Sequence, residues 1–140
     1  MTDARRTPRL RLRALVGAML LQGLSGAFGG LALLLDPSGA AIGIPLDWLE
    51  GSPLMDYFIP GFVLFTALGV MPLIVAHRLW QGRPRSSLAA LSVGIALLVW
   101  IGVEIAVVGY QAEPPLQLVY GVLGAVIVAL AVRPTLRREP

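Results

Sequence analysis

Residues 88–110 read LAALSVGIALLVWIGVEIAVVGY, an apolar stretch in which Glu104 is the only acidic or basic side chain. At about 1.5 Å per residue, a helix of this length crosses a hydrocarbon core of about 30 Å. Similar apolar stretches cover residues 14–35 and 57–79, and a shorter one covers residues 116–132. The sequence therefore predicts an all-α protein with four membrane-spanning helices.

The composition also indicates a membrane protein. Hydrophobic residues make up 56% of the chain and charged residues 14%, against roughly one half and one quarter in soluble domains. The mean hydropathy is +0.79. A chain of 140 residues is the size of one domain, so we expect residues 1–140 to form a single integral membrane domain. The absence of Cys excludes thiol redox chemistry and cysteine nucleophiles.

The basic residues are sorted to one side of the predicted helices. They precede the first stretch, separate the second from the third and follow the fourth: Arg5, Arg6, Arg9, Arg11, Arg13, Arg78, Arg83, Arg85, Arg133, Arg137 and Arg138. Because cytoplasmic connections carry the excess of Lys and Arg, we expect an antiparallel four-helix bundle in a bacterial inner membrane, with both termini cytoplasmic. Attraction to the anionic lipid bilayer then explains the pI of about 10.2, and nucleic acid is not an expected partner.

The longest connection, residues 36–58, joins the first and second helices on the outer side. Within it, residues 46–51, LDWLEG, indicate a short amphipathic helix at the outer interface. The loop also carries the acidic side chains Asp47, Glu50 and Asp56. We expect it to pack as a cap over the bundle and to raise the local concentration of cations at its mouth.

Small residues mark two helix faces that favour close packing. Gly26 and Gly30 are four residues apart in the first helix, and Gly121 and Ala125 are four residues apart in the fourth. This spacing lets helix backbones approach closely in membranes. We expect these faces to pack against another helix, in this chain or in a partner.

Two features inside the helices require a neighbour. Pro72 lies within the second helix, lacks an N–H and crowds the carbonyl of Leu68, so a kink is expected there. A membrane helix tolerates such a break when a neighbour satisfies the freed carbonyl. Gln22 and Ser25 are the polar side chains of the first stretch, and each needs a partner or a hydrogen bond to its own backbone.

Glu104 is the residue that could carry a chemical function, because an intramembrane carboxyl costs free energy and suggests a functional site. The predicted outer half of the helix bundle, with its outer loops, has no Lys or Arg. Glu104 must therefore be protonated, hydrogen-bonded to neutral groups, or paired with a group outside this chain. Depth along the helices, counted at about 1.5 Å per residue, predicts a polar cluster of Glu104 with Trp100, Gln117, Tyr120 and Thr66.

This cluster has two interpretations. It is either a hydrogen-bonded clasp between helices, worth about 0.6–2 kcal/mol, or a site that opens outward beneath the acidic loop. The small-residue faces favour a non-catalytic accessory or assembly component of a membrane complex, which packs against another membrane protein or itself. The alternative is a binding or transport site for a small cation or lipophilic molecule centred on Glu104.

An enzyme is the third choice. One His, no Cys and no second membrane carboxyl leave little for acid–base or nucleophilic chemistry. Neither a cofactor nor a metal site is expected.

Two stretches, GSPLMDYFIPG at residues 51–61 and WIGVEI at residues 100–105, resemble a group of small, uncharacterised bacterial membrane proteins with four spans. Leu116-Gln117-x-x-Tyr120-Gly121 extends the likeness. The resemblance covers the three later helices and implies the same architecture. It implies no activity, because the group has none established.

Overall fold

A computed structural model describes residues 2–110 and 115–136, with side chains over residues 9–110 and 115–132. All regular structure in these ranges is helical, which confirms the predicted all-α class. The main helices are α1 (Thr2–Leu35), α2 (Phe58–Phe65), α3 (Met71–Trp80), α4 (Ser86–Val108) and α5 (Leu116–Leu136). The π-helical segment η3 (Thr66–Val70) joins α2 to α3, so that these elements form one continuous helix.

Three of the described helices are long and apolar enough to cross a membrane: Arg9–Leu35, Phe58–Trp80 and Ser86–Val108. The segment Leu116–Val132 is a shorter apolar helix. Several helix boundaries differ from the predicted ones. The first helix begins at Thr2 because the basic segment continues the same helix. The helix α4 ends at Val108 because Gly109 adopts a φ of 77°, which breaks the helical path.

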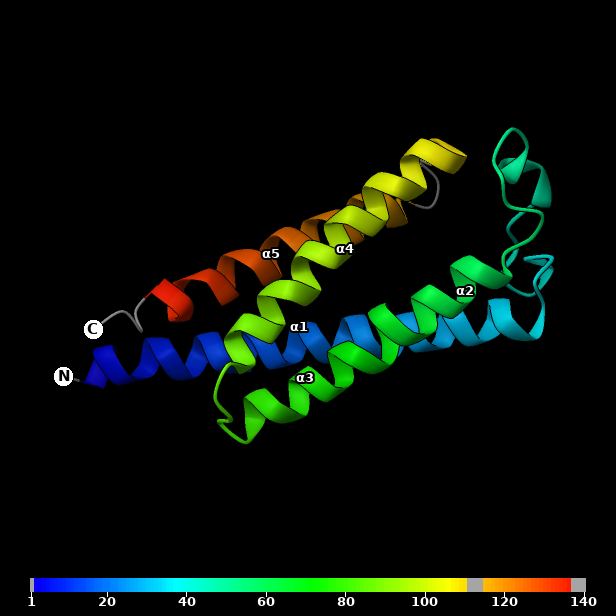
Figure 1. Cartoon of the computed structure of the whole chain (residues 1–140). Coiled ribbons are helices and arrows are strands. Elements are labelled where there is room, and N and C mark those ends of the chain that lie inside the picture. The colour runs from blue at the N-terminus through cyan, green and yellow to red at the C-terminus, as the bar shows by residue number, and fades with distance from the viewer. Residues whose placement is uncertain (1, 111–114, 137–140) are drawn as a thin grey trace.

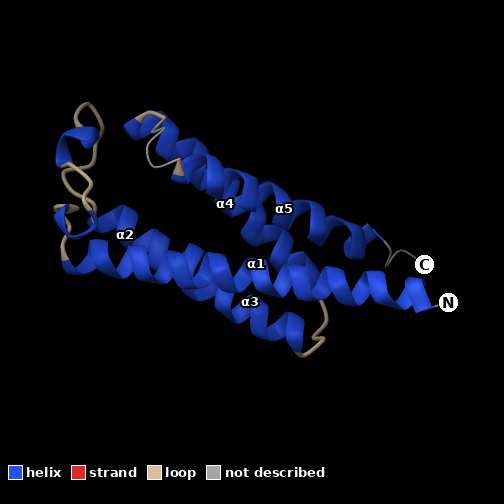
Figure 2. Ribbon diagram, turned by 180° about the vertical axis from the view of Figure 1, so that it is seen from behind, coloured by secondary structure: helices blue, strands red, loops and turns tan. Residues whose placement is uncertain are grey.

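The helices form two packed pairs. Figure 1 shows α1 lying along the continuous helix formed by α2, η3 and α3, and α5 lying along α4. The helix α1 begins and α5 ends at the same end of the molecule, where the two pairs lie close together (Figures 1 and 2). Toward the other end the pairs separate. The loop after α1, which contains the short 3-10 helices η1 (Ala40–Ile42) and η2 (Leu46–Leu49), stands at that end, and η2 contacts α4.

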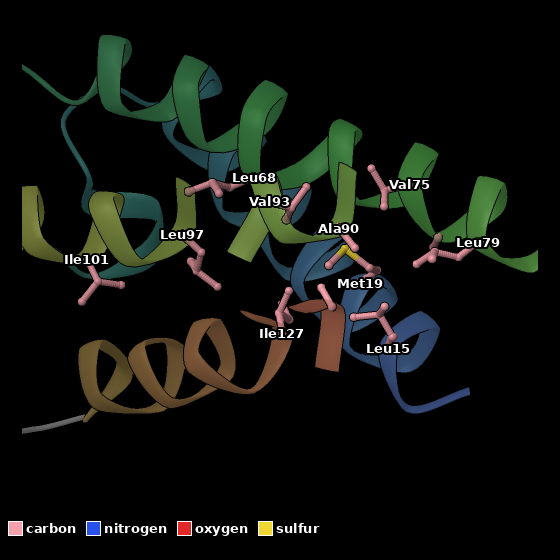
Figure 3. Packing of buried hydrophobic residues seen from close by; sticks show 12 residues of the cluster. Leu15, Met19, Leu68, Val75, Leu79, Ala90, Val93, Leu97, Ile101 and Ile127 are labelled. Carbon is pink, nitrogen blue, oxygen red and sulfur yellow. The ribbon is translucent and has the colours of Figure 1, made fainter. Parts of the chain in front are cut away.

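The main hydrophobic core lies where the helix pairs converge (Figure 3). Met19 of α1, Ala90 of α4 and Ile127 of α5 are completely buried there. Leu68 of η3 and Leu79 of α3 supply the side of the core contributed by the second helix. Buried residues of α1, η3, α3, α4 and α5 make up this core, and the partly buried Leu64 of α2 packs against it.

A kink is expected at Pro72, and the structure has the π-helical segment η3 shortly before this residue. In an α-helix the carbonyl of Leu68 would accept a hydrogen bond from the N–H of residue 72, which Pro lacks. Gln22 of α1 takes this place: its Nε2 donates to the Leu68 carbonyl at 2.9 Å. Ser25 instead bonds its own helix, donating its hydroxyl to the Leu21 carbonyl at 2.7 Å. A side chain of α1 thus satisfies the carbonyl that the proline leaves free.

The Gly26–Gly30 face packs against this chain's own second helix. A Cβ added to Gly26 would overlap the Leu68 carbonyl, and one added to Gly30 would overlap the backbone of Phe65. From the opposite side, a Cβ on Gly69 would lie 2.7 Å from the Ala27 nitrogen. Glycine is required on both helices for the two backbones to meet.

The Gly121–Ala125 face makes no close contact with the described part of this chain, and its expected contact with a partner stays a prediction. Nothing lies within 4 Å of a Cβ added to Gly121, and Ala125 is exposed. The helix α5 instead turns Gln117, Gly124 and Ile127 toward α4, where a Cβ on Gly124 would lie 3.0 Å from a methyl of Leu98. The difference arises because the buried residues follow alternating steps of three and four, so a stripe at a constant step of four lies on a neighbouring face.

The long loop is held by hydrogen bonds from its own residues. The Asp36 carboxylate accepts from the Ser38 hydroxyl at 2.6 Å and from the Ala41 N–H at 3.1 Å. The Tyr57 hydroxyl donates to the Pro45 carbonyl at 2.6 Å. The helical turn expected over residues 46–51 is the 3-10 helix η2. These bonds fix the loop as a folded cap before α2 begins.

Candidate functional site, an apolar cavity beside Glu104

A cavity of about 440 Å³ lies between the two helix pairs, at the end where they separate. Residues of α1, α2, α4, α5 and the long loop line it, and most of them are apolar. The apolar wall includes Leu33 of α1, Val63 of α2 and Val107 of α4. Trp48 and Leu49 of η2 border it from the loop. The packed loop therefore forms part of a binding-sized chamber.

Among the described residues that line this cavity, Glu104 is the only carboxyl and none is basic. Gln117 of α5 is 4% exposed, and its Nε2 donates to Glu104 Oε1 at a long 3.4 Å. The same Nε2 donates to the Gly109 carbonyl at 3.1 Å, where α4 has just ended. Trp100, one turn before Glu104 on α4, lines the same cavity. A neutral amide from α5 thus reaches the carboxyl at the cavity wall.

The structure brings most of the predicted cluster together. Glu104, Trp100, Gln117 and Tyr120 all line the cavity. Thr66 does not line it: its hydroxyl donates to the Phe62 carbonyl of its own helix at 2.8 Å. Thr66 is separated from the cluster because η3 packs against α1 and turns the residue away from the cavity.

The acidic loop residues stand at the same end of the molecule but outside the cavity lining. Asp47, Glu50 and Asp56 are exposed. Asp56 has a local structural role as well, because its Oδ1 accepts a hydrogen bond from the Phe58 N–H at the start of α2. These negative side chains are therefore next in sequence to the lining residues Trp48, Leu49 and Tyr57 but do not contribute to the wall.

Tyr57 is a cavity residue that sequence reasoning missed. Its ring is buried at 5% exposure, and it borders the cavity between the loop and α2. Burial raises the pKa of its hydroxyl, and the nearby carboxyls Asp47 and Glu104 act in the same direction. The hydroxyl therefore stays protonated and keeps donating to the Pro45 carbonyl. The sequence signal that could have indicated this residue is a tyrosine at the end of a proline-rich loop.

Gln22 is the second missed residue, and it lies at the cavity wall on α1. It is 1% exposed, and its Oε1 has no hydrogen-bond partner among the described residues. The Leu68 carbonyl fixes its orientation, since only the amide nitrogen can donate there. Its position as the only amide of the first stretch marked it as needing a partner.

Within the described ranges, no three acidic or histidine side chains gather closely enough to hold a metal ion. What the cavity offers is an apolar volume, one carboxyl and a few fixed hydrogen-bonding groups.

The chain matches none of the protein-family models, curated proteins or solved structures with which it was compared. The resemblance of the three later helices to small bacterial four-span proteins therefore stays a prediction. The site must be interpreted from its own chemistry.

Proposed function

We propose that the protein binds a lipophilic molecule with a hydrogen-bond-donating or cationic head in the cavity beside Glu104. The observation that carries the proposal is a chamber of about 440 Å³ with mostly apolar walls, whose described residues include one carboxyl, Glu104. Small-molecule sites have volumes of about 300–1,000 Å³, mostly apolar linings and a few polar groups that orient the ligand.

The charged groups of the cavity wall determine which polar headgroup of a ligand can bind there. Because no Lys, Arg or His lines the cavity, a carboxyl at this wall is best complemented by a donor that the ligand brings. An ammonium or hydroxyl head meets Glu104, while an alkyl or ring body covers apolar side chains such as Leu33 and Val63. The exposed Asp47, Glu50 and Asp56 near the entrance favour a positive head over a negative one.

The membrane setting belongs to the same proposal. Three apolar helices of sufficient length and the shorter α5 fit a four-span antiparallel bundle in a bacterial inner membrane. The one-sided arginines favour cytoplasmic termini. The cavity then opens toward the outer leaflet, where the loop borders it.

Binding can be measured by tryptophan fluorescence of the protein in lipid nanodiscs, with dodecylamine as the donor probe and dodecane as the apolar control. Glu104→Gln should weaken dodecylamine binding about tenfold or more, since hydrogen bonds to charged groups are worth about 1.5–3 kcal/mol. Dodecane binding should be unchanged by this substitution.

A matched pair of substitutions tests whether the cavity itself is the site. Val63→Trp fills the cavity and should block both probes, whereas Val99→Trp, on an exposed part of α4 outside the lining, should block neither. Equal dodecylamine binding by the wild type, Glu104→Gln and Val63→Trp would refute the proposal. If Glu104→Gln lost only thermal stability, the carboxyl would be a clasp between helices.

The second proposal is an accessory or assembly role in a membrane complex. The exposed small-residue face of Gly121 and Ala125 favours it, because such faces allow close contact between membrane helices. The Gly26–Gly30 face gives no such support, since this chain's own second helix covers it. Disulfide cross-linking of an Ala125→Cys variant in membranes should capture a second copy or a partner. Cross-linking no stronger than for Val99→Cys, placed on α4, would remove the support from this face.

A further inference from the structure

A second groove lies at the end of the molecule opposite the cavity, between the start of α1 and the end of α3. Its volume is about 240 Å³, and its lining consists of Arg9, Leu12, Arg13 and Trp80. None of these residues takes part in the Glu104 site.

The groove lies where the apolar spans end. The membrane-compatible part of α1 starts at Arg9, and that of the second helix stops at Trp80. Both boundaries meet in the same groove, which places it at the level of lipid headgroups. Trp80 is 67% exposed, as expected of an aromatic residue in the interfacial belt.

The two arginines line the same groove. Arg9 and Arg13 are one helical turn apart and therefore share a face of α1. Neither forms an ion pair with a side chain that the structure describes, and the described carboxylates lie in the long loop or on α4 near its far end. The groove therefore holds two guanidinium groups whose charge is compensated by no carboxylate among the side chains that the structure describes.

We propose that this groove binds the phosphodiester headgroup of an anionic glycerophospholipid in the adjacent leaflet. Guanidinium groups donate to phosphate oxygens in pairs, and the indole of Trp80 adds an N–H donor beside an apolar ring. Leu12 supplies an apolar surface for the glycerol and the first methylenes of the acyl chains. Basic pockets between membrane helices on the cytoplasmic side recognise lipid headgroups in this way.

The apolar part of the lining distinguishes a lipid from free phosphate. Leu12 and the ring of Trp80 would contribute nothing to a small hydrated anion, whereas they cover the apolar part of a lipid next to its phosphate. The groove should therefore prefer phosphatidylglycerol to phosphatidylcholine through charge, and either lipid to inorganic phosphate through apolar contact.

Native mass spectrometry of the full chain released from detergent micelles tests this, because it counts individual bound lipids. Arg9→Gln/Arg13→Gln should weaken phosphatidylglycerol binding about thirtyfold, from a roughly fivefold contribution per arginine. The control Arg78→Gln/Arg83→Gln removes the same charge outside the groove lining and should leave binding within about threefold. Trp80→Leu should weaken binding severalfold, and circular dichroism checks that each variant folds.

Equal loss in the two double variants would overturn the proposal, since binding would then follow net charge alone. Complete displacement of phosphatidylglycerol by millimolar inorganic phosphate would also overturn it, because the groove would then recognise the free anion. A lipid site would be supported if inorganic phosphate failed to displace phosphatidylglycerol and only Arg9→Gln/Arg13→Gln, not the control, lost phosphatidylglycerol binding.

Discussion

The hydrogen bond from Gln22 to the Leu68 carbonyl predicts an energetic coupling between Gln22 and Pro72. Pro72 leaves this carbonyl without its α-helical donor, and Gln22 Nε2 supplies one from α1 at 2.9 Å. Gln22→Met keeps the length of the side chain but removes the donor. The cost of this change should depend on whether residue 72 has an N–H.

The expected magnitude follows from the burial of the bond. An unpaired buried acceptor costs about 1–3 kcal/mol, while hydrogen bonds between membrane helices average about 0.6 kcal/mol and reach about 1.7 kcal/mol. Gln22→Met also removes the unpartnered Oε1, which offsets part of the loss. We expect Gln22→Met to destabilise the protein by about 1 kcal/mol when Pro72 is present.

In a Pro72→Ala background, residue 72 regains a backbone N–H that can reach the Leu68 carbonyl by ordinary α-helical spacing. Gln22→Met should then cost close to nothing, which gives a coupling free energy of about 1 kcal/mol. Unfolding by dodecyl sulfate in mixed micelles, monitored by circular dichroism, gives the four free energies of the cycle.

Ser25→Ala is the matched control, because its hydroxyl bonds the carbonyl of Leu21 in the same helix. It should show no coupling to Pro72→Ala. Equal costs of Gln22→Met in the two backgrounds, within the usual additivity limit of about 0.3 kcal/mol, would refute the coupling.

Two further predictions concern the helix contact and the loop. Gly26→Ala should destabilise the protein by about 1–3 kcal/mol or more, since the added Cβ overlaps the Leu68 carbonyl. The control Gly17→Ala should not destabilise it, because nothing lies within 4 Å of a Cβ added there. Equal thermal stability of the two variants would contradict this packing. The hydrogen bond from the Ser38 side chain lowers the pKa of Asp36 below its usual value of 3.8. Asp36 therefore contributes stability above that value and loses it as the pH falls through the lowered pKa. Ser38→Ala should raise this pKa in an NMR titration, and an unchanged titration would count against the bond.

The sequence predicted the features that depend on local chemistry. Apolar length predicted the helices, and depth along α4 and α5 predicted that Gln117 would meet Glu104. Each of these follows from distances along one helix or across one short turn. The structure places Gln117 and Glu104 within hydrogen-bonding distance for this reason.

Features that depend on helix rotation and separation could not be predicted in this way. Thr66 shares the approximate depth of the cluster but faces elsewhere. Gly124, and not Gly121, meets α4, because the phase of α5 is set by the packing of Ile127 in the core. The cavity arises because the helix pairs diverge toward the loop, and no residue pattern within a single helix encodes that divergence.

The π-helical segment has a further consequence for the second helix, because it inserts the equivalent of one residue into the helical repeat. Each residue turns an α-helix by about 100°. Before η3, Pro60 and Val63 face the cavity; after it, Val75 and Leu79 face the core. Deleting a single residue within Thr66–Val70 would therefore rotate the cavity wall by about a quarter turn while leaving the core half in place. The register of this one helix sets the shape of the chamber.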